Sequence, residues 1–200
     1  MIHEIYDLTR LALAYGRVER GVNHPDGKPE TDTDHSVSLA WLACSLAQKF
    51  YPELDKGKIA QFAIVHDAVE VYAGDTYAVT AGDEGRRFQA EREHEAYEQI
   101  RDQFTVLPWL PEMIAEYERF DCPEANFVRA VDKMMPEIVL RIEGCPGKTL
   151  RSKGVTPEMI HEFREYKQAQ MNGYAKDFPE LLKLREELYA LLTLEDEMAV

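Results

Sequence analysis

The stretch Ile64-Val65-His66-Asp67-Ala68-Val69-Glu70 decides how this chain is interpreted, because it places an imidazole beside a carboxylate in an apolar run. The spacing of the apolar residues around it predicts a helix over about 56–73, ended by Gly74. A buried imidazole and carboxylate are costly to remove from water unless something pairs them, and one metal ion would pair both. Two residues elsewhere in the chain, His35 and Asp132, are suited to complete such a set.

Helical periodicity also runs through the rest of the chain, and no stretch shows strand alternation. A helix beginning at Thr33 or Asp34 as its N-cap runs to about Phe50, with Trp41 on its apolar face, and a polar loop precedes it at about 21–29. The other expected helices span about 2–15, 86–106, 110–120, 124–143, 157–172 and 179–193. The sequence therefore predicts an all-α bundle of about seven or eight helices, forming a single domain over residues 1–200.

The amino-acid composition indicates which broad class of protein this is. Of the 200 residues, 45% are hydrophobic and 30% are charged, which is typical of a soluble globular protein. No apolar stretch approaches the roughly 20 residues that a membrane crossing needs, and the N-terminus lacks a signal-peptide pattern. The net charge of −14 argues against duplex nucleic acid as a partner, although it leaves room for a small phosphorylated substrate.

The cysteines indicate the compartment. Cys44, Cys122 and Cys145 are isolated and show no paired spacing. A sparse, odd set of this kind argues against a disulfide framework and favours a reducing environment, so we expect a cytoplasmic protein.

The candidate ligands come from three different predicted helices. His35 lies in the first turn of its helix, His66-Asp67 in the middle of the next, and Asp132 in the middle of the helix at about 124–143. Convergence of side chains from separate helices is a common way to build a metal site in a bundle. Two imidazoles and two carboxylates suit Mn²⁺, Fe²⁺, Co²⁺, Ni²⁺ or Zn²⁺ and leave coordination positions for water and substrate.

The order H…H-D…D on the helices of an all-α chain resembles the HD-domain metal-dependent phosphohydrolases. The segment from His66 to Asp75, which reads H-D-x-x-E-x-x-x-G-D, is similar to that of their 5′-deoxynucleotidase branch. The resemblance spans about residues 5–142, and the helices at about 157–193 lie beyond its strongest part.

This resemblance implies a role for each matching residue. It makes His35, His66, Asp67 and Asp132 the metal ligands, and Glu70 and Asp75 a catalytic acidic pair. Arg17 takes the place of a substrate-contacting arginine, but the family has Trp after that arginine where this chain has Val18, and the loop at 21–31 is built differently. Lys133 is either a second substrate contact or a lysine paired with an acidic neighbour.

Helical spacing supports the acidic roles independently of the resemblance. Glu70 follows His66 by four residues, so both side chains project from the same face of the predicted helix. A carboxylate there is placed to take a proton from the water that attacks phosphorus, or to hold that water in line. Asp75 follows Gly74 and is placed to protonate the leaving oxygen or to orient the nucleophile.

The leading functional hypothesis is a metal-dependent hydrolase of (deoxy)nucleoside 5′-monophosphates. The first alternative is an HD-domain dNTP triphosphohydrolase, for example a dATPase, that releases triphosphate. A (p)ppGpp hydrolase and a non-catalytic nucleotide-binding module are further alternatives. The expected partners are a small nucleotide substrate and a second copy of the chain, in a homodimer or larger homo-oligomer.

Overall fold

A computed structural model describes residues 1–24, 26–75, 78–143, 150 and 154–198. These residues form ten helices and one small antiparallel hairpin, so the fold is all-α as expected. In chain order the elements are α1 (Ile2–Tyr15), β1 (Glu19–Asn23), β2 (Pro29–Thr31), α2 (Asp32–Phe50), α3 (Lys56–Val65), α4 (Glu70–Ala73), α5 (Ala78–Gln103), α6 (Trp109–Glu118), α7 (Pro123–Asp132), α8 (Met135–Glu143), α10 (Pro157–Tyr174) and α11 (Pro179–Met198).

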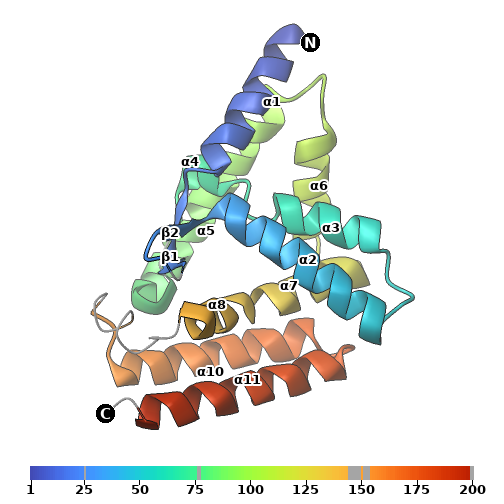
Figure 1. Cartoon of the computed structure of the whole chain (residues 1–200). Coiled ribbons are helices and arrows are strands. Elements are labelled where there is room, and N and C mark those ends of the chain that lie inside the picture. Colours follow the sequence, from blue (N-terminus) through green and yellow to red (C-terminus); the bar gives the residue numbers. More distant parts are fainter. Residues whose placement is uncertain (25, 76–77, 144–149, 151–153, 199–200) are drawn as a thin grey trace.

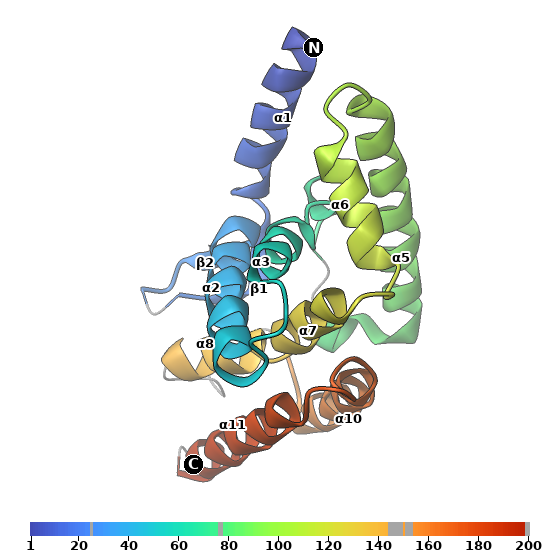
Figure 2. The same cartoon turned by 90° about the vertical axis from the view of Figure 1, so that its right-hand side faces the viewer.

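The helices pack around two clusters of buried apolar residues. The larger cluster joins α2, α3, α7, α10 and α11 through residues such as Leu39, Phe62 and Phe127. The smaller cluster joins α1, α5 and α6 to the turn that follows α3, with Ile100 and Phe104 fully buried. Figure 1 shows α2 and α3 crossing the middle of the molecule, and Figure 2 shows α5 beside α6. The end of α3 therefore lies where the two clusters meet.

Two of the expected helices are each divided in two. The helix expected over about 56–73 ends at Val65, and a turn over residues 66–69 connects it to α4. In this turn the amide of Ala68 donates to the Val65 carbonyl, and the amide of Glu70 donates to the Asp67 carbonyl. These bonds span three residues rather than four, so the chain is wound more tightly there than in an α-helix. The prediction that His66 and Asp67 lie in the middle of a helix was wrong.

The helix predicted around Asp132 is also divided. It is the last residue of α7 rather than the middle of a helix over about 124–143, and α8 begins only at Met135. Here too a bond that spans three residues tightens the chain, from the amide of Met134 to the Val131 carbonyl. Asp132 therefore lies at the end of a helix, and Asp67 lies in the turn that follows one.

The loop expected at about 21–29 contains the β1–β2 hairpin, which the sequence pattern did not indicate. The hairpin leads directly into α2, whose N-cap is Thr31 instead of Thr33 or Asp34. Thr31 and Asp34 form a reciprocal capping box, so Asp34 belongs to the first turn of the helix. Trp41, expected in the core, is 76% exposed, because α2 turns Leu39, Ala43 and Ala47 inward instead.

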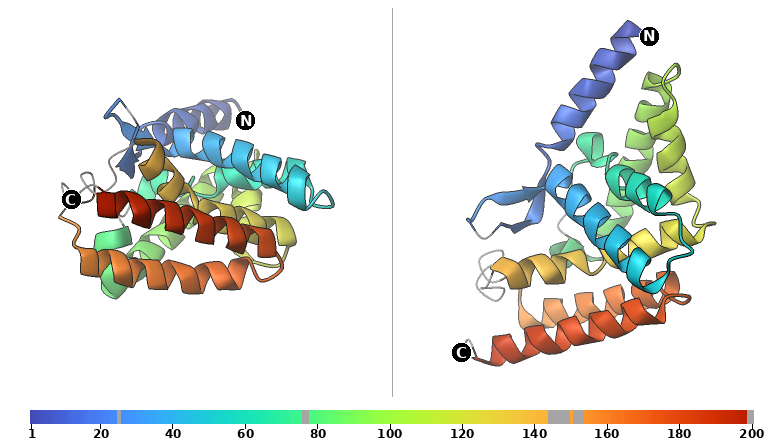
Figure 3. Two further views of the ribbon diagram at one scale, coloured as in Figure 1. Left: turned by 60° about the horizontal axis from the view of Figure 1, so that its bottom comes forward. Right: turned by 45° about the vertical axis from the view of Figure 1, so that its right-hand side comes forward.

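The C-terminal helices complete the bundle. Figures 1 and 3 show α10 and α11 lying side by side along one edge of the molecule, next to α7 and α8. Within the described residues, none of the helices combines the length and the apolar character needed to cross a membrane. Of the three cysteines, Cys44 and Cys122 are free thiols and Cys145 lies outside the described residues.

Candidate metal centre

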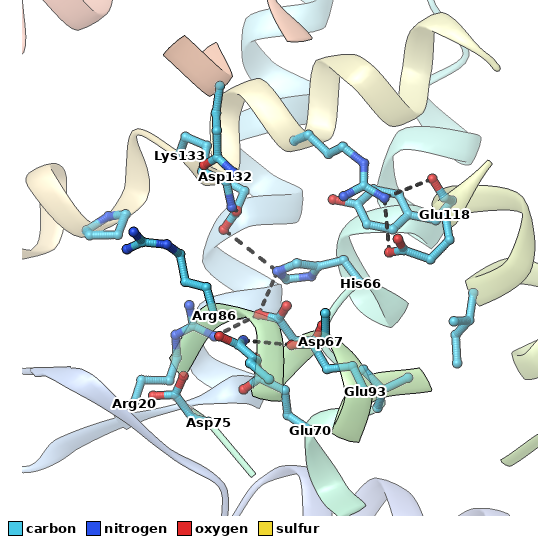
Figure 4. Close-up of a pocket in the computed structure, with 18 of the residues that line it drawn as sticks. Arg20, His66, Asp67, Glu70, Asp75, Arg86, Glu93, Glu118, Asp132 and Lys133 are labelled. Atoms are coloured by element: carbon cyan, nitrogen blue, oxygen red, sulfur yellow. Dashed lines mark hydrogen bonds and ion pairs between the residues drawn. The ribbon is translucent and has the colours of Figure 1, made fainter. Parts of the chain in front are cut away.

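Three of the predicted ligands converge at the junction of α2, α3 and α7. The potential ligand atoms of His35, His66 and Asp132 all lie within 4.8 Å of one another, and all three residues are buried. His35 Nε2 is 3.0 Å from Asp132 Oδ1, and His66 Nε2 is 3.8 Å from the same oxygen. Figure 4 shows Asp132 facing His66 across the site. Residues separated by almost 100 positions in the sequence thus form one compact set.

The protonation of His66 fits a metal ligand. Its Nδ1 is 3.0 Å from the Ala63 carbonyl oxygen, which only accepts hydrogen bonds, so Nδ1 carries the proton. In the neutral ring Nε2 then presents a lone pair. That atom is buried and has no hydrogen-bond partner among the described residues, although Asp67 Oδ2 lies 2.8 Å away. Burial opposes protonation of this ring, but the charge of Asp67 outweighs it and raises the pKa of His66, so a cation shared by these two atoms would displace a proton.

A second set of carboxylates lies beside the first. One oxygen each from Asp32, Asp67 and Glu70 lies within 4.8 Å of the others. Asp32 Oδ2 and Glu70 Oε2 are buried without a hydrogen-bond partner in the described part of the chain. Oxygen atoms of this kind can hold a hard divalent cation, and Asp67 lies next to both sets.

Arg20, on β1, neutralises part of this negative charge. Its Nη1 is 2.7 Å from Asp67 Oδ2 and 3.0 Å from Asp32 Oδ1. Its Nε is 3.4 Å from Glu30 Oε2, on the neighbouring strand β2. The hairpin therefore carries the positive charge that the acidic set needs, and Figure 4 shows Arg20 reaching Asp67.

Burial and neighbouring charges change the proton affinities of the site. Burial lowers the pKa of the His35 imidazole to about 4, so the ring is neutral and able to ligate near pH 7. Burial, followed by the charges of Asp67 and Asp32, raises the pKa of Glu70 to about 11. Burial and the charge of Asp67 likewise raise the pKa of Asp32 to about 7. A bound cation would oppose both of these increases.

Members of both sets line a cavity of about 790 Å³, namely His66, Asp67, Glu70 and Asp132. Its wall includes both predicted catalytic residues, Glu70 and Asp75, and also Lys133. Figure 4 shows Glu70 and Asp75 on one side of the cavity and Lys133 on the other. A cavity of this size is large enough for a nucleotide.

Two residues were assigned to substrate on the sequence alone. Lys133 lines the cavity, and its Nζ is 2.7 Å from Asp132 Oδ2, so the structure contains the acidic pairing that the sequence left as an alternative. Arg17 is exposed in the turn after α1 and is not among the residues that line the cavity. Arg20 reaches the cavity instead, and the role of Arg17 stays a prediction.

Sequence reasoning missed Arg20 and Asp32. Arg20 was missed because strand β1, from which its side chain reaches the cavity, was not predicted. Asp32 was missed because the N-cap was placed too late, which left its carboxylate outside the expected helix.

The arrangement as a whole suits hydrolysis of a phosphate ester. It combines the neutral imidazole of His35, the buried imidazole of His66, carboxylates with unused lone pairs and a cavity with nearby lysines. Metal-assisted hydrolysis needs such a ligand set together with a carboxylate that can exchange a proton with water.

Comparisons with known proteins agree with this geometry. The family model described as an HD domain matches residues 17–175. The bovine 5′-deoxynucleotidase HDDC2 is 30% identical over 132 residues, and the aligned region covers 60% of this chain and 60% of that relative. The mouse 5′-deoxynucleotidase HDDC2 is 30% identical over 159 residues, which are 74% of this chain and 71% of that protein.

A solved structure shares the fold. The protein named a predicted metal-dependent phosphohydrolase from Magnetospirillum magnetotacticum MS-1 superposes with a TM-score of 0.70 at 21% identity, over 94% of this chain and 95% of that one. The family model covers most of the chain, including the three ligands that converge in the site. The chain therefore belongs to the HD domain family.

Proposed function

We propose that this protein is a metal-dependent phosphohydrolase that converts (deoxy)nucleoside 5′-monophosphates to nucleoside and phosphate. The observation that carries the proposal is the convergence of His35, His66 and Asp132, together with the place of His66, Asp132 and Glu70 on the wall of one cavity. The names of the bovine and mouse relatives support the choice of a deoxynucleotide substrate.

In this proposal His35, His66, Asp67 and Asp132 hold a divalent transition metal, one of Mn²⁺, Co²⁺, Fe²⁺, Ni²⁺ or Zn²⁺. Such an ion, when bound, supplies Lewis acidity, which lowers the pKa of water and neutralises charge on phosphoryl oxygens. The buried Nε2 of His66 and the neutral ring of His35 are the features of this chain that suit it.

Glu70 and Asp75 carry the proton transfers. Glu70 Oε2 is buried without a hydrogen-bond partner among the described residues, so it is available to accept a proton from the attacking water. Asp75 lines the same cavity. We assign to this pair both the deprotonation of the water and the protonation of the 5′-oxygen that leaves phosphorus. Lys133 is assigned to the substrate phosphate.

The test is to incubate purified protein with Mn²⁺ or Co²⁺ and either dAMP or dATP, and to identify the products. We expect deoxyadenosine and inorganic phosphate from dAMP. Glu70→Gln should lower the rate by at least about a hundredfold, as expected for loss of a general acid–base group, while metal content is unchanged. Glu91→Gln, on the exposed face of α5, is the matched control and should retain the wild-type rate.

Two results would contradict the proposal. Absence of turnover of either nucleotide by the metal-loaded protein would refute phosphohydrolase activity on these substrates. Triphosphate released from dATP, without turnover of dAMP, would assign the site to triphosphate hydrolysis instead.

A further inference from the structure

Helix α10 places a buried lysine in the wall of the catalytic cavity. Lys167 is only 7% exposed and lines the cavity together with Lys133 and Gln170. Lysine is among the residues that proteins bury least often, because its ammonium group loses strong hydration unless other groups replace it. The position of Lys167 therefore needs an explanation.

The contacts of the Lys167 ammonium within the protein are long. Its Nζ is 3.9 Å from Glu137 Oε1 and 3.5 Å from the carbonyl oxygen of Lys133, to which it donates. It also lies 5.0 Å from the centre of the Phe163 ring. Charge-assisted hydrogen bonds of good geometry are about 2.7–2.9 Å long, so none of these contacts uses the ammonium fully. Burial lowers the pKa of Lys167, and the charge of Glu137 opposes this effect.

A buried polar network holds Lys167 in this position. Behind it, Tyr189 donates to Glu137 Oε1 at 3.4 Å, and Arg185 donates to the Tyr189 hydroxyl. Arg185 is 1% exposed and also donates to Gln168 Oε1 at 2.8 Å. Buried networks of this kind often stabilise a fold no better than apolar residues of the same volume. Here the network reaches the ammonium of Lys167 through Glu137 and the backbone of Lys167 through Arg185.

Lys133 connects Lys167 to the proposed metal ligands. Lys133, whose carbonyl accepts from Lys167, has its own Nζ 2.7 Å from Asp132 Oδ2. Asp132 Oδ1 in turn is 3.0 Å from His35 Nε2. Lys133 and Lys167 therefore form a cationic wall at the metal centre, and the acidic pair Glu70 and Asp75 lies elsewhere on the same cavity. An anion that contacts the metal centre would be within reach of this wall.

We propose that Lys167, acting with Lys133, binds the phosphate group of the substrate, so that α10 supplies a determinant of specificity for phosphate monoesters. This inference rests on the proposed function and extends it to a residue in the C-terminal helices. A phosphate dianion supplies the short acceptors that the Lys167 ammonium lacks inside the protein. A nucleoside without phosphate gains nothing from this lysine.

The test compares Lys167→Met and Lys167→Arg with Lys176→Met, a control at an exposed lysine just after the end of α10. Calorimetry measures the Kd of inorganic phosphate for each Mn²⁺-loaded protein. Kinetics measure the KM for dAMP and the inhibition constant of deoxyadenosine. In Lys167→Met we expect both the phosphate Kd and the KM to rise by about tenfold to a hundredfold, as for loss of a charge-assisted contact.

The inhibition constant of deoxyadenosine should stay within about twofold of wild type, because RT ln 2 is small beside the loss of a charged contact. Lys167→Arg should recover part of the phosphate affinity, and Lys176→Met should match wild type. Equal weakening of phosphate and deoxyadenosine would assign Lys167 a purely structural role and overturn the inference. An unchanged phosphate Kd in Lys167→Met would also overturn it. Failure of the wild-type protein to hydrolyse dAMP would instead refute the proposed function, and the phosphate Kd values are read independently of turnover.

Discussion

At the scale of single residues, Arg20 shows how this site tolerates so many buried carboxylates. Its guanidinium contacts Asp32, Asp67 and Glu30 with its own side chain 15% exposed. Removal of one partner from a buried ion pair is strongly destabilising, because it leaves the other charge uncompensated. Arg20 therefore contributes to stability most when no metal offsets the acidic set.

Arg20→Met is predicted to lower the free energy of unfolding of the chelator-treated protein by about 3 kcal/mol or more, for this reason. Arg17→Met is the matched control, because Arg17 is exposed, and it should stay within about 0.5 kcal/mol of wild type. Urea unfolding at pH 7.5 measures both values. Addition of Mn²⁺ should reduce the loss in Arg20→Met, and equal losses in the two variants would contradict this account of Arg20.

At the scale of elements, the ligands depend on where helices end. The turn over residues 66–69 and the end of α7 at Asp132 interrupt helices that the apolar periodicity predicts as continuous. After the turn over residues 66–69, the chain leaves the helical conformation again at Gly74. Its φ of 73° and ψ of 149° lie in a region that only glycine adopts readily. Gly74 directs the chain from α4 to Asp75, on the cavity wall.

Gly74→Ala is predicted to destabilise the protein by about 1–3 kcal/mol, the cost of that backbone conformation for a residue with a Cβ atom. It should also reduce the rate of dAMP hydrolysis, because Asp75 would move. Gly173→Ala is the control: a Cβ atom at this position in α10 meets no other atom within 4 Å, so alanine should stabilise the helix by about 0.5–1 kcal/mol. Thermal unfolding and initial rates test the pair, and a stable, fully active Gly74→Ala would refute the role of this turn.

The same elements show what sequence can and cannot predict here. His66 was singled out because it is a costly polar residue in an apolar run, and the resemblance to the HD-domain phosphohydrolases implied His35 and Asp132 as further ligands. Arg20 and Asp32 were missed because their positions depend on a five-residue strand and on an N-cap, and short elements have weak local signals. Lys167 was missed because only the packing of α10 against α7 brings it to the cavity.

At the scale of the whole molecule, the site lies between two apolar clusters. Ala63 belongs to the larger cluster and Val65 to the smaller, so His66 follows directly at their junction. The same packing withdraws Asp32 from water completely. The site therefore combines rigid positioning with a strong dependence of its charge on pH.

The contribution of Asp32 to the stability of the metal-free protein is predicted to decline as pH rises from about 4 to about 7. Its pKa is raised from 3.8 to about 7 by burial and by Asp67, so the folded state keeps a proton that the unfolded state has already released. The contribution of Asp32 to stability is then present below pH 3.8 and is lost as pH approaches 7. Asp32→Asn should flatten this decline.

Metal affinity, in contrast, should increase as pH rises. A cation beside Asp32 and Glu70 displaces their protons, so its affinity should increase with pH. We expect the increase in Tm produced by a fixed concentration of Mn²⁺ to grow between pH 5.5 and pH 8. An increase in Tm that is independent of pH would show that these carboxylates do not share protons with the metal site.

The most direct test of the metal centre is anomalous diffraction from crystals grown with Mn²⁺. We expect one strong peak in contact with His35 Nε2, His66 Nε2 and a carboxylate oxygen of Asp132, three residues whose potential ligand atoms lie within 4.8 Å of one another. Crystals that contain saturating Mn²⁺ but show no peak among these three residues would contradict this prediction.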